Sequence, residues 1–371
     1  MTHDVAVLGL GPAGRALAHR LVAAGASVLA IDPSPQRPWR PTYGGWREQI
    51  PGWLGTEVIG ASSDRTDLIA RSRHRLPGTY VVLDNEALQT RLGLGGATVR
   101  AEHLSAEQAR TLDARVVVDC RGNLRGAASG VPIQTAHGLK LPADVGRTLL
   151  GEGEGEADAV LMDWRPFDGT SGWGGRRPSF CYVIPLPDGR VLAEETCLAG
   201  RPPIERTELA HRLGVRLSRA GVDARHWRGA EVERVHIPML PPPAEVPNRF
   251  GAAGAEVNPI TGYSVFASLA AVDDAARSLL ATGSLPDVPR PWRRIALEAL
   301  LQLDGRGTVD LFDAYGRLPQ RAQRAVLDPH SSQPDLLAAL GRQWALMTPR
   351  GRLALVTATA RGWMPTLGQR R

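Results

Sequence analysis

The chain has 371 residues, of which 43% are hydrophobic and 22% charged, with 41 glycines and 29 prolines. This composition is typical of a soluble, loop-rich protein of enzyme size and excludes the disordered, fibrous and coiled-coil classes. No run reaches the ~18 consecutive apolar residues that a membrane-spanning helix needs. The 3 cysteines lack metal-ligand and CxxC spacing, which argues against a disulfide framework and a metal site and favours the reducing cytoplasm.

The formal net charge is +6, and all but one of the 44 basic residues are arginines. The chain has no long block of like charges, and its aromatic residues do not interleave with a basic stripe, so no nucleic-acid partner is expected. A basic protein is nevertheless attracted to an anionic membrane surface, and peripheral contact with a membrane is compatible with this charge.

The first segment has the order of a dinucleotide-binding unit. Residues 4–10 predict a buried strand, 15–24 an amphipathic helix, and 27–31 a second strand. A GxGxxG turn separates the first strand from the helix, and an acidic residue follows the second strand. Glycines let a pyrophosphate approach the backbone N–H groups, the helix N-terminus stabilises the anion, and the acid can bind a ribose. The residues predicted for this site are Gly9, Gly11, Pro12, Ala13, Gly14 and Asp32.

Three features favour FAD over NAD as the dinucleotide. Residues 33–53 are irregular and rich in Pro and Trp, where an NAD domain would continue with regular βαβ repeats. An apolar strand at 115–119 ends in a turn at Gly122, as expected for a chain that returns to the nucleotide domain. Residues 250–265 predict a strand, a Gly/Ala-rich turn and a helix beginning near Thr261–Gly262, whose N-terminus could face the flavin. The candidate residues in this last segment are Gly254, Pro259 and Gly262.

The middle of the chain predicts antiparallel strands. A Gly/Glu-rich loop at 151–158 precedes strands at 159–165, 179–185 and 190–198, and the turn at 186–189 joins the last two as a hairpin. An amphipathic helix at 206–220 and a strand at 232–239 follow. From 272 onward the pattern is helical, and 334–364 combines apolar residues with Trp and Arg. That last segment is compatible with an interfacial membrane helix and equally with an ordinary packed helix.

These elements predict an α/β protein: a Rossmann-type FAD-binding flavoprotein fold with an inserted antiparallel-sheet substrate domain and a helical C-terminal region. We expect residues 1–150 to form the first part of the FAD-binding domain, with some substrate-domain elements inserted. Residues 151–245 are expected to form the mainly antiparallel substrate sheet, 246–275 to return to the FAD-binding domain, and 276–371 to form a helical C-terminal region that is compatible with facing a membrane.

The predicted strand at 190–198 contains two adjacent carboxylates, Glu194 and Glu195. Successive side chains of a strand point to opposite faces, so at most one of the two can face a given cavity. An apolar surrounding favours the neutral form of a carboxyl group, as a general acid requires. The pattern alone does not decide which glutamate faces the flavin.

With these residues in view, the chain resembles the FAD-dependent lycopene cyclase family of plants and bacteria over roughly residues 4 to 350. The motifs that carry the resemblance are Thr42-Tyr43-Gly44-Gly45-Trp46, Gln134-Thr135-Ala136-His137-Gly138, Met162-Asp163-Trp164-Arg165, Leu192-Ala193-Glu194-Glu195-Thr196 with Arg201-Pro202 after it, Ile237-Pro238-Met239 and Pro259-Ile260-Thr261-Gly262-Tyr263. Asn85 and Asn258 stand where Arg and His are common in the family.

The resemblance implies that the protein cyclises the linear ends of lycopene, or of a related carotene, into β-ionone rings without net redox change. Glu194 would be the acid or base, and Glu195 would tune it or shuttle protons. Reduced FAD would stabilise the carbocation, with NAD(P)H as reductant, and Tyr43, Trp46 and Trp164 could add cation–π stabilisation. Because lycopene resides in the bilayer, the resemblance implies a cytoplasmic protein that associates peripherally with the membrane.

Three alternatives stay open at the level of the sequence. A flavin monooxygenase or isoprenoid reductase on the same scaffold would consume NAD(P)H in every cycle, but would not need the Glu194-Glu195-Thr196 strand. A non-catalytic carotenoid- or flavin-binding relative fits the changes at Asn85 and Asn258. A cyclase for another polyene or terpenoid would retain all the motifs.

Overall fold

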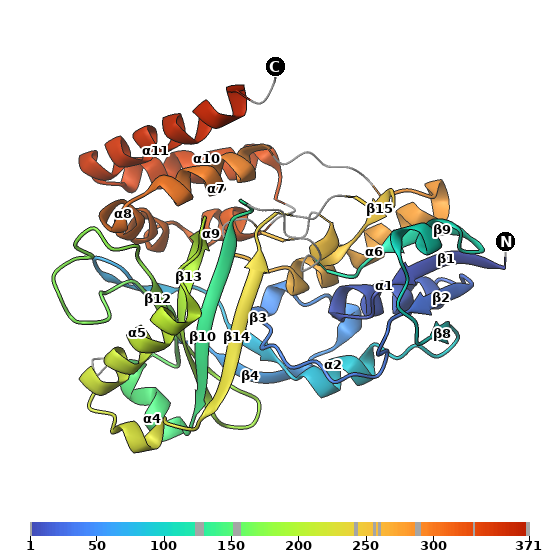
Figure 1. Cartoon of the computed structure of the whole chain (residues 1–371), viewed down its shortest axis with the longest axis horizontal. Helices are drawn as coiled ribbons and strands as arrows, with labels where there is room; N and C mark the ends of the chain where they lie inside the picture. Colours follow the sequence, from blue (N-terminus) through green and yellow to red (C-terminus); the bar gives the residue numbers. More distant parts are fainter. Residues whose placement is uncertain are drawn as a thin grey trace.

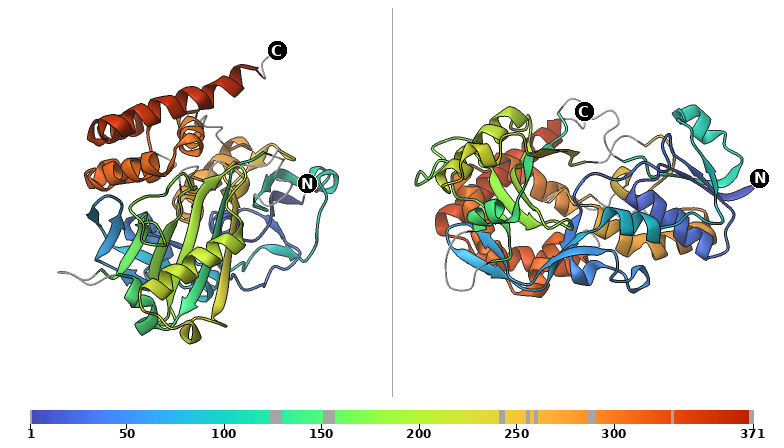
Figure 2. Two further views of the ribbon diagram at one scale, coloured as in Figure 1. Left: turned by 60° about the vertical axis from the view of Figure 1, so that its left-hand side comes forward. Right: turned by 90° about the horizontal axis from the view of Figure 1, so that it is seen from below.

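The computed structural model describes residues 2–122, 130–150, 157–240, 244–254, 257–258, 261–285, 291–328 and 331–368. A parallel sheet that contains the N-terminal strand occupies one end of the molecule (Figure 1), and a larger sheet occupies the other. The C-terminal helices lie over the larger sheet, and the view from below shows the same two halves side by side (Figure 2). The predicted α/β class, with a parallel sheet, an inserted mainly antiparallel sheet and a helical C-terminal region, is confirmed.

The parallel sheet has five strands in the order β15-β9-β1-β2-β8. Its central strands are apolar runs, as expected for a parallel sheet buried on both faces. The strand predicted at 115–119 does return to this sheet, where Val7 pairs with Val118 beside the N-terminal strand. The strands are β1 (His3–Leu8), β2 (Val28–Ile31), β8 (Thr98–Arg100), β9 (Ala114–Asp119) and β15 (Asn248–Arg249).

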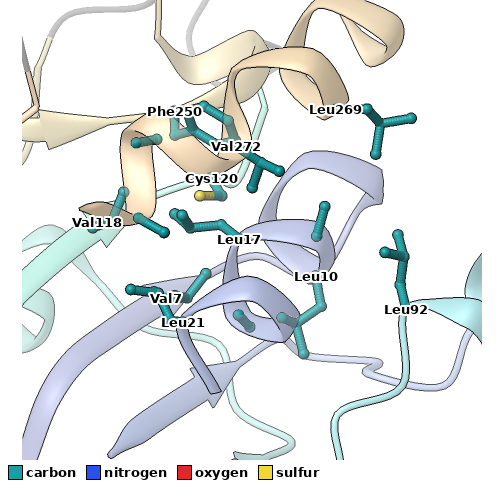
Figure 3. Close-up of a cluster of buried hydrophobic side chains, with 14 of the residues drawn as sticks. Val7, Leu10, Leu17, Leu21, Leu92, Val118, Cys120, Phe250, Leu269 and Val272 are labelled. Carbon is teal, nitrogen blue, oxygen red and sulfur yellow. The ribbon is translucent and has the colours of Figure 1, made fainter. Parts of the chain in front are cut away.

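Two helices cover one face of the parallel sheet and share its core (Figure 3). Helix α1 (Pro12–Ala23) contributes Leu17 and Leu21 to this core, and helix α6 (Val265–Thr282), which packs on α1, contributes Leu269 and Val272. All four side chains are fully buried, so residues far apart in the sequence fix the position of α1. The last of these helices begins at Val265 and not near Thr261–Gly262, because Gly262 has a φ of 75° that no helix accepts.

The larger sheet has seven strands in the order β14-β10-β13-β12-β11-β5-β6, antiparallel except for the β11–β5 pair. The predicted hairpin is present: Leu186 N donates to Arg190 O at 2.8 Å, and Gly189 has the positive φ that the tight turn requires. The strands are β5 (Thr66–Ile69), β6 (Arg73–Leu76), β10 (Ile133–Leu141), β11 (Ala159–Asp163), β12 (Phe180–Pro185), β13 (Val191–Gly200) and β14 (Glu231–Pro238).

A small antiparallel sheet, β3-β7-β4, lies between the parallel sheet and the larger sheet. Its middle strand carries the fully buried Val81, which belongs to the core of the parallel sheet, and the nearly buried Tyr80, which belongs to the core of the larger sheet. Its strands are β3 (Gly44–Trp46), β4 (Ile59–Ser63) and β7 (Tyr80–Leu83). The short helices in the first part of the chain are α2 (Asn85–Arg91), α3 (Ala106–Arg110) and α4 (Ala143–Arg147), and the last of them packs on the larger sheet.

Helices cover both faces of the larger sheet. Helix α5 (Arg206–Arg219) packs on one face through Leu213 and Leu217, the spacing that predicted it. The opposite face is covered by the C-terminal helices α7 (Pro291–Gln302), α8 (Gly305–Gly316), α9 (Gln320–Leu327), α10 (Gln333–Leu346) and α11 (Pro349–Gly368). None of the helices within the described residues is long and apolar enough to cross a membrane.

The apolar, Arg-flanked segment at 334–364 forms two helices instead of one. Helix α10 ends before Met347, whose backbone is extended, and α11 then runs outermost on the molecule (Figure 2). Asp310 of α8 fixes the break, because its carboxylate accepts hydrogen bonds from Thr348 N at 3.0 Å and Thr348 Oγ1 at 3.1 Å. Capping by a side chain from another helix could not be read from the local sequence.

Candidate active site

A mainly apolar cavity of about 340 Å³ lies between the larger sheet and the C-terminal helices. Its walls come from the small sheet, the larger sheet, the start of α6 and all five C-terminal helices. Among the described residues that line it, Glu194 is the only one with an ionisable carboxyl group. The cavity therefore combines an apolar wall with one acid, which is typical of a site for a hydrophobic substrate.

Glu194 projects from β13 into this cavity and is 8% exposed. Burial, and after it the repulsion by the negative charge of Glu233, raise the pKa of its carboxyl group to about 8, and a hydrogen bond from Thr196 works in the opposite direction. Thr196 Oγ1 donates this bond at 3.0 Å. The carboxyl group of Glu194 is consequently protonated at neutral pH and able to donate a proton.

Glu195 points to the other face of the sheet, as the alternation of a strand requires. Its carboxylate accepts a hydrogen bond from Ser179 Oγ at 2.5 Å and lies 3.0 Å from Arg216 Nε of α5. Glu195 is fully buried there and does not line the cavity. Glu195 thus contacts α5 from β13, and Glu194 is the one of the two glutamates that faces the cavity; a part for Glu195 in tuning the acid or shuttling protons stays a prediction.

Three tyrosines gather beside Glu194. Tyr182 lies directly opposite Glu194 in the β12–β13 ladder, and its hydroxyl is 2.9 Å from that of Tyr80 on β7. Tyr263 joins them in the wall of the cavity. Burial raises the pKa of all three phenols, and the negative charge of Glu194 raises the pKa of Tyr80 and of Tyr263 further. The phenols thus remain protonated hydrogen-bond donors around the acid.

The sequence analysis assigned no role to these tyrosines, although one of them could have been found. The turn at 186–189 sets the hairpin register, and in that register Tyr182 falls opposite Glu194. Tyr80 and Tyr263 come from distant segments of the chain, and no local pattern brings them together.

Only one of the three predicted aromatic residues lines the cavity. Trp46 does so, with its ring 5.4 Å from that of Tyr80 and the guanidinium of Arg324 3.6 Å above it. Trp164 is 1% exposed and packs between Phe180 and Phe312, so it belongs to the core beneath the cavity. Tyr43 packs on the core of the parallel sheet instead. Neither Trp164 nor Tyr43 lines this cavity, and their contact with substrate stays a prediction.

The glycine-rich turn after β1 has the shape of a dinucleotide cradle. A Cβ at Gly14 would collide with Gly9 O and lie 2.8 Å from Cys120 Cβ, so a glycine is required for close packing of α1. A Cβ at Gly11 would meet nothing within 4 Å, which leaves open space at the start of the helix. No side chain caps α1, which begins at Pro12 and has no acid in its first turn. Its uncapped N–H groups fit a pyrophosphate.

Asp32 lies against the same turn. Its carboxylate accepts a hydrogen bond from Leu10 N at 2.8 Å and another from Ser34 N at 2.7 Å. These bonds fix the acid at the end of β2 and leave lone pairs on both oxygens for a ribose hydroxyl. The residues Gly9, Gly11, Pro12, Ala13, Gly14 and Asp32 are thus brought together around one end of the parallel sheet.

The remaining predicted cofactor residues follow the strands or precede α6. Gly122 comes after β9 with a φ of 83°, and Gly254 follows the short 3₁₀ helix at Gly251–Ala253. Gly262 packs so closely on Gln134 that a Cβ would contact the amide oxygen, and Gln134 Nε2 donates to Thr261 O at 3.0 Å. Pro259 lies outside the described residues.

A parallel sheet of the dinucleotide-binding type, combined with an inserted, mainly antiparallel sheet, is the arrangement of the two-domain flavoprotein fold. Solved structures show the same fold: a flavoprotein/dehydrogenase from Cytophaga hutchinsonii has a TM-score of 0.54 at 12% identity, covering 92% of this chain and 99% of that chain. The peptidyl tryptophan dihydroxylase QhpG has a TM-score of 0.51 at 17% identity, covering 96% and 79%. At these identities the likeness concerns the fold alone.

The chain is an enzyme of the lycopene cyclase family, whose model, described as lycopene cyclase protein, matches residues 4–345. An uncharacterized carotenoid cyclase of Deinococcus radiodurans is 30% identical over 96% of this chain and 93% of its own length. The chloroplastic lycopene beta cyclase of an Oncidium hybrid cultivar is 28% identical over 91% and 80%. The resemblance drawn from the sequence motifs is confirmed.

Proposed function

We propose that this enzyme converts the linear ends of lycopene, or of a related carotene, into β-ionone rings with no net redox change. The observation that carries the proposal is Glu194, the single carboxyl group among the described cavity-lining residues, which is buried and has a pKa raised to about 8. Membership of the lycopene cyclase family supplies the substrate class.

In the proposed reaction, the Glu194 carboxyl group donates its proton to the terminal double bond of the polyene. The resulting carbocation is attacked by a neighbouring double bond of the same chain, and the ring forms with a new carbon–carbon bond. A proton then leaves a ring carbon and restores Glu194, so substrate and product have the same composition. The phenol oxygens of Tyr80 and Tyr182 and the ring of Trp46 would stabilise positive charge on the substrate.

FAD is the cofactor we propose, because the cradle at Gly11 and the uncapped start of α1 fit its pyrophosphate and Asp32 fits its ribose. Gly122, Gly254, Pro259 and Gly262 belong to the segments proposed to contact the rest of the cofactor. When bound and reduced, with NAD(P)H as the source of electrons, FAD supplies an electron-rich ring system that stabilises a nearby cation.

We propose that substrate enters from a membrane through the C-terminal helices. Trp344 of α10 and Leu355 of α11 line both the main cavity and a second, more open one between these helices. On the same helix, Val356 lines the second cavity and is 51% exposed, and Leu353 is 68% exposed. Arg350, in the same helix, is also exposed. Exposed apolar side chains beside a cation favour peripheral contact with an anionic bilayer.

The test is an anaerobic incubation of the purified protein with lycopene in liposomes, FAD and a limiting amount of reductant. We expect a product of unchanged mass, formed far in excess of the reductant and abolished in Glu194→Gln. Glu107→Gln, at an exposed position of α3, is the matched control and should leave turnover unchanged. A gain of oxygen or hydrogen, or turnover that stops with the reductant, would identify a monooxygenase or reductase. Turnover of another polyene alone would identify a different cyclase.

A further inference from the structure

A row of three residues runs across the larger sheet behind the acid. Gly138 of β10 pairs with Glu194 of β13 on one side and with Glu233 of β14 on the other. Paired residues of an antiparallel ladder lie on the same face of the sheet, so the two glutamates flank a position that has no side chain. A Cβ at Gly138 would already lie 3.3 Å from Glu194 Oε2, so no larger residue could separate the two carboxyl groups.

The carboxylate of Glu233 is held in place by hydrogen-bond donors and a nearby cation. Thr42 N donates to Oε1 at 2.8 Å and Thr42 Oγ1 donates to Oε2 at 2.7 Å. Lys140 Nζ lies 3.9 Å from Oε2 and also contacts Glu231 at 2.8 Å. Donated N–H and O–H groups stabilise an ionised carboxylate and fix its position. Glu233 does not line the cavity, so it does not compete with Glu194 for the substrate.

The contact partner of Glu233 lies next to the cavity wall in the sequence. Thr42 directly precedes Tyr43 and strand β3, whose residues Gly44, Gly45 and Trp46 line the cavity. The double hydrogen bond therefore links the position of this wall to β14, two strands away from the acid.

We infer that Glu233 is a positioning residue that holds Glu194 in its protonated, proton-donating form by the repulsion of its fixed negative charge across Gly138. This inference rests on the proposed function only in giving Glu194 the role of acid. The titratable groups that face Glu194 from the other elements are Tyr80 of β7, Tyr182 of β12 and Tyr263 before α6, all neutral phenols. Glu233 is thus the group that places a negative charge near Glu194, and the positive charge of Lys140, 3.9 Å from Glu233, partly offsets that charge.

The direct test titrates the infrared C=O band of the protonated Glu194 carboxyl group, identified by its absence in Glu194→Gln. In Glu233→Gln the amide still accepts a hydrogen bond from Thr42 but the charge is gone, and we expect the band to titrate at lower pH than in the wild type. Lys140→Met removes the offsetting cation, and the same band should titrate at higher pH. Thr42→Val keeps the charge of Glu233 and should leave the midpoint unchanged. Unchanged midpoints in both Glu233→Gln and Lys140→Met would overturn the inference.

Cyclisation kinetics supply the second readout. In Glu233→Gln the alkaline limb of the pH profile should move to lower pH, and each unit of movement lowers the rate above the limb about tenfold. KM should stay unchanged, because Glu233 does not touch the cavity. Activity lost equally at every pH, with the infrared midpoint unmoved, would show a merely structural role and refute the inference. A moved midpoint in a protein that cyclises no carotene would refute the proposed function and leave the role of Glu233 intact.

Discussion

Arg216 Nε lies 3.0 Å from Glu195 Oε2, and this ion pair is buried on the face of the larger sheet that faces away from the cavity. Arg216 also donates to Arg165 O at 3.0 Å, so it links α5 to both β13 and the end of β11. Successive residues of a strand alternate between faces, and fixing Glu195 on one side therefore fixes Glu194 on the other. The pair explains why two adjacent carboxyl groups have different surroundings.

Arg216→Met leaves the carboxylate of Glu195 buried without its cation, and removal of one partner of a buried ion pair costs about 3–5 kcal/mol. We expect the free energy of unfolding, measured by urea denaturation, to fall by that amount. Arg277→Met removes a cation from the exposed pair with Asp274 and should cost no more than about 0.5 kcal/mol. Equal losses in the two variants would contradict the structural role of Arg216.

Glu194→Gln should remove a pH dependence from the stability of the protein. The pKa of Glu194 rises from 4.5 to about 8 on folding, so the native state binds more protons than the unfolded state between these values. The wild type therefore loses stability relative to Glu194→Gln as the pH rises through this window, by at most about 5 kcal/mol, and the difference is constant at higher pH. Urea denaturation of both proteins across this pH range measures the effect, with Glu107→Gln as the exposed control. Parallel curves would show that Glu194 titrates normally.

Replacement of Gly11 and replacement of Gly14 by alanine should affect different properties of the protein. Gly11→Ala places a methyl group in open space, so the apoprotein should lose about 1 kcal/mol or less, while flavin affinity falls at least about tenfold. Gly14→Ala drives the methyl group into Gly9 O, and overpacking should cost the apoprotein about 1–3 kcal/mol. Denaturation of the apoprotein and flavin fluorescence titration separate the two effects. Gly52→Ala, which also places a methyl group in open space but away from the turn, is the control. If Gly11→Ala bound flavin as tightly as this control, Gly11 would not be part of the dinucleotide site.

The exposed apolar side chains of α11 should determine binding to vesicles. Leu353→Ser with Val356→Ser removes two exposed apolar side chains whose burial would contribute about 1.5–3 kcal/mol each. We expect at least about a tenfold weaker co-sedimentation with anionic vesicles and unchanged thermal unfolding. Val99→Ser changes an apolar residue that is 39% exposed on β8, at the other end of the molecule, and should leave vesicle binding intact. The same loss in both variants would argue against docking through α11.

Local patterns were sufficient to predict strands β1, β2 and β9 of the parallel sheet, the glycine turn, the hairpin and the alternation of Glu194 and Glu195, but not strand β8. These features depend on residues close in sequence: glycine conformations, turn register and the two-residue period of a strand. The role of Glu233 was not predicted, because its proximity to Glu194 depends on how β10 pairs with two other strands.

The contacts of aromatic residues were the least predictable part of the site. Trp46 and Trp164 both lie in family motifs, yet only Trp46 reaches the cavity. Trp164 is covered by Phe312 of α8, a helix far along the chain. Whether an aromatic ring becomes core or cavity wall depends on such tertiary contacts, which sequence periodicity does not describe.

The arrangement of the parallel sheet has a consequence for synthesis of the protein. Strand β1 at His3–Leu8 needs β9 at Ala114–Asp119 as its neighbour, and β9 in turn pairs with β15 at Asn248–Arg249. Helix α6, which covers α1, ends only at Thr282. A ribosome that has made the first hundred or so residues has therefore exposed an apolar strand and helix that have no partners yet. Such nascent chains aggregate readily, so high-yield production should depend on slow translation or on chaperones that bind the N-terminal segment until its partners emerge.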